Sequence, residues 1–109
     1  MPANGEAAAR KFYSELLGIP EREKPSHLKA RGGAWFESST IKIHLGVETN
    51  FVPAKKAHPA ILVSGLAELS TKLQDAGYEV QNDEPVDGKS HFYVADPFGN
   101  RLEFMEENS

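Results

Sequence analysis

Two segments of the chain, Glu6–Leu17 and Leu66–Ala76, place their apolar residues at helical spacing. In the first segment Ala8, Phe12 and Leu16 recur every four residues, so that one side of a helix can face a core. The second segment has a similar apolar stripe. The residues expected to cap these helices are Asn4 and Ser64, and the residues expected to end them are Gly18 and Gly77. We therefore predict one helix in each half of the chain.

Other segments alternate apolar and polar residues, which is typical of strands with two unlike faces. The clearest is Ile41–Val47, in which Lys42 and His44 lie between aliphatic residues. The segment Asp96–Asn100 predicts a turn, because proline suits the second position of a turn and glycine tolerates positive φ. The other predicted strands are His27–Arg31, Ala34–Glu37, Ala57–Val63, Tyr78–Gln81, Ser90–Ala95 and Arg101–Met105.

The two halves of the chain repeat one plan. A shift of 59 positions lays Gly32–Glu37 on His91–Asp96 and Ile41–Leu45 on Asn100–Phe104. In this register His44 meets Glu103, so that each half places a side chain able to bind a metal at the same point. The repeat predicts a site built around a pseudo-twofold axis.

The second half reads as strand, helix and three strands, whereas the first half lacks the opening strand. The counterpart of Ala57–Val63 falls mostly before Met1, with Met1 and Pro2 as its tail. We expect the upstream DNA to encode an apolar strand bearing His, Gln or Glu. The predicted organisation is one domain over residues 1–109, with module one at 1–48, a linker at 49–56 and module two at 57–109.

Composition excludes several classes of function. The 109 residues carry a formal net charge of −4, which argues against a nucleic-acid partner. The chain has no cysteine, and so neither a disulfide nor a thiolate site. Because no apolar run reaches the length of a membrane span and no signal-peptide pattern is present, we expect a cytoplasmic protein without a membrane partner.

Three polar residues are candidates for metal binding. His44, His58 and Glu103 each lie on a predicted strand, where the bulkier aliphatic residues take the opposite face. Two imidazoles and a carboxylate form a set that suits Zn, Ni, Co, Mn or Fe. Each residue also has an ordinary interpretation: a histidine on a strand is often a surface residue, His58 can be solvated, and Glu103 can pair with a neighbouring cation. His91 could support the site or contact a substrate, or it could be an exposed strand residue.

Several motifs resemble the vicinal oxygen chelate superfamily, which includes glyoxalases, bleomycin resistance proteins and extradiol dioxygenases. The motifs are Asp96–Glu103 (DPFGNRLE), Ala9-Arg10-x-Phe12-Tyr13 followed by Leu17-Gly18, Gly33-x-Trp35-Phe36, His44-Leu45 and Ala57-His58-Pro59-Ala60. The resemblance implies an α+β fold of paired βαβββ modules, with a curved mixed sheet and helices on its convex face. It also implies metal ligands at His44, His58 and Glu103, and a fourth upstream of Met1.

The resemblance implies a divalent metal ion and a small bidentate oxygen-containing substrate. Lyase, thiol transferase and dioxygenase chemistry are all compatible with that arrangement, with Glu103 and His91 as the candidate catalytic residues. The alternative is a metal-free protein that binds or sequesters a small molecule or drug. We expect a homodimer, because an incomplete first module exposes a sheet edge.

Overall fold

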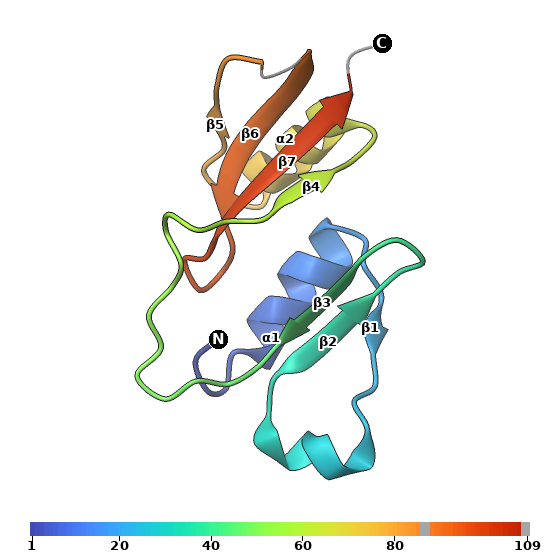
Figure 1. The fold of residues 1–109 in the computed structure, drawn as a ribbon, viewed down its shortest axis with the longest axis vertical. Coiled ribbons are helices and arrows are strands. Elements are labelled where there is room, and N and C mark those ends of the chain that lie inside the picture. Colours follow the sequence, from blue (N-terminus) through green and yellow to red (C-terminus); the bar gives the residue numbers. More distant parts are fainter. Residues whose placement is uncertain (86–87, 108–109) are drawn as a thin grey trace. The chain divides into compact units, whose positions relative to one another are not determined.

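The computed structural model of the chain describes residues 1–85 and 88–107, apart from the side chain of Glu107 (Figure 1). It divides the chain into two compact units, Met1–Val52 and Pro53–Ser109. Each unit contains a helix and a small sheet, and the predicted α+β class is confirmed. Among the described residues, no helix combines the length and the apolar character needed to cross a membrane.

The first unit packs one helix on a three-stranded sheet. The helix begins as α1 (Glu6–Ala9) and continues as a π-helical segment (Arg10–Leu16). The strands are β1 (Glu21–Arg22), β2 (Ala34–Glu37) and β3 (Lys42–Leu45), antiparallel and in the order β1-β2-β3. The fully buried side chains include Phe12, Tyr13 and Phe36, so that the apolar stripe of the helix faces the apolar side of β2.

The second unit has the complete strand, helix and three-strand order that the sequence predicts. Its elements are β4 (Ala60–Leu62), α2 (Leu66–Asp75), β5 (Gln81–Asn82), β6 (Lys89–Ala95) and β7 (Arg101–Glu107). The sheet order is β4-β7-β6-β5, in which β4 is parallel to β7 and the other pairs are antiparallel. The mixed sheet is therefore confirmed within this unit, and β7 lies between β4 and β6.

Met1, which the sequence predicts to be the tail of an opening strand, pairs with the segment that follows β3. Its amino group donates to the carbonyl of Gly46 at 2.8 Å, and its carbonyl accepts from the amide of Glu48 at 2.9 Å. Bonds to the residues on both sides of Val47 are the pattern of a parallel bridge. Met1 therefore lies beside the continuation of β3 as β4 lies beside β7.

Two local predictions are wrong, and a third is displaced, because only Gln81 of the predicted strand Tyr78–Gln81 lies in β5. The segment His27–Arg31 is part of a 3-10 helix, Ser26–Arg31, which Gly32 ends at φ 74°. Leu28 and Ala30 do alternate with polar residues, but the amide of Leu28 donates to the carbonyl of Pro25 at 2.9 Å, which closes a turn where a strand was expected. Neither Asn4 nor Ser64 caps a helix, because Gly5 and Gly65 occupy the N-cap positions.

The N-terminus of α2 is instead capped by a residue distant in sequence. The carboxylate of Glu106, on β7, accepts hydrogen bonds from the amides of Gly65 at 2.8 Å and Leu66 at 3.2 Å. A carboxylate there satisfies free amide groups and the positive end of the helix dipole. The cap therefore depends on the parallel pairing of β4 with β7.

The turn at Asp96–Asn100 is confirmed, and Asp96 holds it together. Its carboxylate accepts hydrogen bonds from the amides of Phe98 and Asn100, both at 2.9 Å, and from the Asn100 side chain at 3.0 Å. Asp96 is only 4% exposed, so these bonds satisfy a buried charge. This part of the DPFGN motif has a structural role.

The repeat between the two halves changes its offset by one residue at this turn. Glu103 lies opposite Tyr93, and His44 lies opposite Trp35. Glu103 is 59 positions after His44, but Tyr93 is only 58 after Trp35, because the turn at 96–100 is one residue longer than the turn at 38–41. The alignment of Gly32–Glu37 with His91–Asp96 is therefore wrong by one position. A shift of one exchanges the two faces of a strand, so this correction decides which side chains accompany the candidate ligands.

Candidate functional site

Three of the predicted site residues come together in the second unit. Glu103 lies on β7, His91 on the adjacent strand β6, and His58 two residues before β4, the strand on the other side of β7. His58 Nε2 lies 2.9 Å from Glu103 Oε1, and His91 Nδ1 lies 2.8 Å from Glu103 Oε2. The central position of β7 therefore brings one carboxylate between two imidazoles.

This cluster is shielded from solvent. His91 is 4% exposed and Glu103 is 9% exposed, while the side chain of His58 is 21% exposed. The interpretation of His91 as an exposed strand residue is therefore wrong. Glu103 pairs with the two histidines in place of a neighbouring lysine or arginine.

The outer nitrogen of each imidazole faces a backbone carbonyl. His58 Nδ1 lies 3.0 Å from the carbonyl oxygen of Lys56, and His91 Nε2 lies 2.7 Å from that of Glu84. Because a carbonyl only accepts, these hydrogen bonds place a proton on each outer nitrogen. In a neutral imidazole the inner nitrogen then has a lone pair, and this lone pair is directed at an oxygen of Glu103.

The proton count shows what this cluster requires. Its four nitrogen–oxygen contacts need four protons, and two neutral imidazoles beside a carboxylate contain two. Two further protons would complete the four hydrogen bonds, and a cation bound at one carboxylate oxygen would take the place of one of these protons. With neutral imidazoles, the cluster therefore directs lone pairs of nitrogen and oxygen at one another, and these lone pairs favour the binding of positive charge.

Tyr93 connects this cluster to a neighbouring pocket. Its ring contacts the rings of His58 and His91 edge to face, with centroids 5.3 and 5.5 Å apart. The guanidinium carbon of Arg101 lies 4.1 Å from the centroid of the Tyr93 ring, within the range of a cation–π interaction. Tyr93 thus has the buried carboxylate on one side and a fixed cation against its ring.

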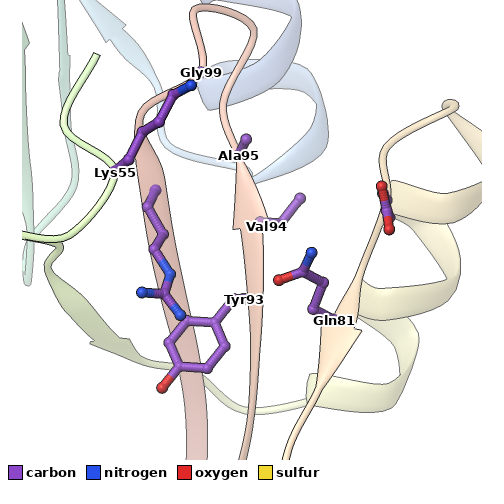
Figure 2. Close-up of a pocket in the computed structure, with 8 residues that line it drawn as sticks. Lys55, Gln81, Tyr93, Val94, Ala95 and Gly99 are labelled. Atoms are coloured by element: carbon purple, nitrogen blue, oxygen red, sulfur yellow. The ribbon is translucent and has the colours of Figure 1, made fainter.

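The pocket beside Tyr93 has a volume of about 430 Å³ and lies wholly within the second unit. Figure 2 shows Tyr93, Val94 and Ala95 along β6, with Gln81 on the neighbouring strand and Lys55 on the segment before β4. Lys55, Arg101 and Gln81 offer hydrogen-bond donors, and Glu79 is the acidic lining residue. This size falls within the range of small-molecule sites, and its polar donors suit a ligand rich in oxygen.

His44 lies in the first unit and has its own partners. Its ring stacks on Trp35, with centroids 3.8 Å apart and planes 3° from parallel. Its Nε2 lies 2.6 Å from Glu37 Oε2. The hydrogen bond with His44, together with the charges of Lys42 and Arg22, lowers the pKa of Glu37 below its ordinary value.

Several residues beside the candidate ligands were not predicted as site residues, although Trp35 lies in the Gly33-x-Trp35-Phe36 motif. Tyr93 and Trp35 are the aromatic residues directly opposite Glu103 and His44, and Glu37 is the partner of His44. The sequence does contain a signal for them, because an aromatic residue lies across the hairpin from each candidate ligand. The difference in turn length concealed it, since the uniform shift of 59 matched Trp35 with Val94.

The fit of the cluster to a metal ion rests on its donor chemistry. In the ranges 1–85 and 88–107, no three or more histidine, aspartate or glutamate side chains are arranged so that they could hold a metal ion. His58 and Glu103 nevertheless have the donor types that divalent metals bind, and backbone carbonyls orient both imidazoles as they do in metal sites. A cation held by His58 and Glu103 would replace the contact between these two side chains.

A family profile, "Glyoxalase/Bleomycin resistance protein/Dioxygenase superfamily", matches residues 2–104 of the chain. A crystal structure of a protein assigned to the glyoxalase family from Bacillus anthracis is 48% identical in sequence. Its TM-score is 0.93, and the match covers 99% of this chain and 88% of that one. Among curated proteins, none matches the chain.

More distant structures share the fold. Lactoylglutathione lyase from Agrobacterium tumefaciens is 19% identical, with a TM-score of 0.71 over 97% of this chain and 88% of that one. TnmS3, an antibiotic binding protein from Streptomyces sp. CB03234, is 17% identical, with a TM-score of 0.72 over 99% and 91%. An enzyme and a binding protein therefore have the same fold as this chain.

Proposed function

Because the chain belongs to the glyoxalase/bleomycin resistance protein/dioxygenase superfamily, we propose that it binds a divalent metal ion and a small ligand with two neighbouring oxygens. The observation that carries the proposal is the direction of two imidazole nitrogens at the two oxygens of the buried Glu103 carboxylate. His58 and Glu103 are the proposed metal ligands of the second unit. His91 is proposed to hold Glu103 in position and to exchange a proton with it.

The proposed activity is that of a metal-dependent enzyme. When bound, the metal would act as a Lewis acid on the ligand oxygens and stabilise negative charge that develops there. Lyase, thiol transfer and dioxygenase reactions all use such an oxygen pair. Arg101 and Lys55 would bind the negative charge of the ligand, and Gln81 would donate a hydrogen bond.

Tyr93 is proposed to position both parts of this site. Its ring contacts both histidines and Arg101, so that movement of the ring would disturb the imidazoles and the cation together. The ring also forms a wall of the pocket beside the buried carboxylate. A ligand in this pocket would therefore contact Tyr93 and Arg101, which adjoin the histidines of the cluster.

Calorimetric titration of tag-free, metal-stripped protein with Zn²⁺, Ni²⁺, Co²⁺ or Mn²⁺ tests the metal site. We expect His58→Ala and Glu103→Gln to weaken binding at least about tenfold, because each removes a proposed ligand. His27→Ala is the matched control, since His27 is exposed on the 3-10 helix. Equal affinity in all three variants would refute the metal site. His44→Ala tests separately whether the predicted ligand of the first unit contributes.

A metal-free binding protein is the second candidate. It is favoured by the pocket beside Tyr93, whose polar lining residues can bind a ligand without a metal ion. In that case small-molecule binding would be unchanged by chelators and by His58→Ala, but weakened by Arg101→Gln. The same set of variants therefore separates the two candidates.

A homodimer is part of the proposal. β4 is the end strand of its sheet, and Leu62 on this strand is 61% exposed. An edge strand with an exposed aliphatic side chain favours association with another copy. Light scattering coupled to size-exclusion chromatography tests this, and a mass of one chain at micromolar concentration would contradict it.

A further inference from the structure

A second pocket, with a volume of about 610 Å³, lies wholly within the first unit. Four cationic residues line it, against two carboxylates, which gives a local charge of 4 − 2 = +2 with His44 neutral. The whole chain has a formal net charge of −4. The charged residues are Arg22, Lys24, Lys29, Lys42, Glu23 and Glu37.

The two carboxylates do not neutralise all four cations. Lys29 pairs with Glu23, and Arg22 pairs with Glu37 at 3.3 Å. The ammonium of Lys24 donates to the carbonyl oxygen of Gly32, which carries no formal charge. Among the described residues the ammonium of Lys42 has no ion pair or hydrogen bond, although its charge helps to lower the pKa of Glu37. Lys24 and Lys42 therefore provide the excess positive charge.

The stacked pair of Trp35 and His44 contributes aromatic surface to the same pocket. The two rings are nearly parallel, 3.8 Å apart, and the imidazole side chain is 40% exposed. Glu37 holds the imidazole from its Nε2 side, which restrains rotation of the ring. An aromatic surface held in place beside the cations Lys24 and Lys42 favours a flat, negatively charged molecule.

We propose that the pocket of the first unit binds a small aromatic molecule carrying two carboxylates or a phosphate. Lys24 and Lys42 would bind the anionic groups, and the Trp35–His44 pair would pack on the ring. This inference goes beyond the metal site, because it concerns a different unit and requires no metal ion.

Titration of metal-free protein with phthalate tests the inference. Trp35 is the only tryptophan of the chain, so its fluorescence reports on this pocket alone. We expect saturable quenching by phthalate and none by the neutral phthalamide. Cyclohexane-1,2-dicarboxylate has the same charges without the flat ring and should bind more weakly. Inorganic phosphate should compete with phthalate, and added salt should weaken binding through screening.

Variants separate a charge effect from general destabilisation. Loss of one cation near the anion should weaken binding roughly fivefold in Lys42→Met, and charge reversal in Lys42→Glu should weaken it further. Lys11→Met is the matched control, since Lys11 is exposed on the helix of the same unit and does not line the pocket. Far-ultraviolet circular dichroism checks that each variant is folded. Equal quenching by phthalamide, or equal phthalate affinity in the Lys42 and Lys11 variants, would overturn the inference.

Discussion

Replacement of Gly33 by alanine should destabilise the first unit far more than the same change at Gly18. Both glycines have positive φ, 88° at Gly33 and 77° at Gly18, which an alanine adopts with strain. A Cβ at Gly33 would lie 2.1 Å from the carbonyl oxygen of Leu45, whereas a Cβ at Gly18 would meet nothing within 4 Å. The pair of variants therefore separates the steric cost from the conformational cost.

The expected loss of stability follows from the conformational cost and the steric cost. Positive φ costs an alanine about 1–2 kcal/mol, and this is the whole effect expected for Gly18→Ala. At Gly33 the contact is with backbone, so that β2 and β3 must separate, which adds about 1–3 kcal/mol. We expect Gly33→Ala to lose roughly 2 kcal/mol more of the free energy of unfolding than Gly18→Ala.

Urea unfolding followed by the fluorescence of Trp35 measures this difference. Trp35 lies on β2, two residues after Gly33, and so reports on the unit that is perturbed. With an m-value of about 1–3 kcal/mol/M, a difference of 2 kcal/mol separates the two midpoints by roughly 1 M. Coincident midpoints would refute the close approach of Gly33 to β3.

Two further predictions concern carboxylates that bind backbone amides. Glu106→Ala should lower the free energy of unfolding by about 1–2 kcal/mol because it removes the cap of α2, while the exposed Glu15→Ala serves as control; equal midpoints in denaturant would contradict the cap. The hydrogen bond from the Gly33 amide is the main cause that lowers the pKa of Glu6 below its ordinary value of 4.5. The ionised form is therefore favoured by folding, so the stability difference between wild type and Glu6→Gln should be present at pH 7 and diminish as the pH falls below 4.5. A difference independent of pH would show that the carboxylate charge is not involved.

The local patterns of the chain predicted most of its elements. Both helices, the hairpin strands and the turn at Asp96–Asn100 lie where periodicity and turn chemistry placed them, because these signals depend on neighbouring residues. Repetition between the halves also indicated the order of elements in each unit. The strand predicted at His27–Arg31 was wrong because five alternating residues are too short a pattern to outweigh the local 3-10 hydrogen bonds of Ser26–Arg31.

The candidate site was predicted only in part. The sequence singled out Glu103, His58 and His91, but it did not show that both histidines contact the same carboxylate. It also placed Glu103 and His44 at equivalent positions of the repeat, but it did not identify the residues that lie opposite them. Those partners, Tyr93 and Trp35, depend on strand register, and the longer turn of the second hairpin changes that register by one residue.

The sequence by itself thus determined where most helices and strands form and which polar residues are candidates for metal binding or catalysis. Only the tertiary structure decided that Glu106 caps α2, that Met1 pairs beside Val47, and that two imidazoles face one buried carboxylate. These contacts join residues more than ten positions apart, and their geometry depends on how strands pair. Because side chains alternate between two faces, a single added residue in a turn decides which of them meet.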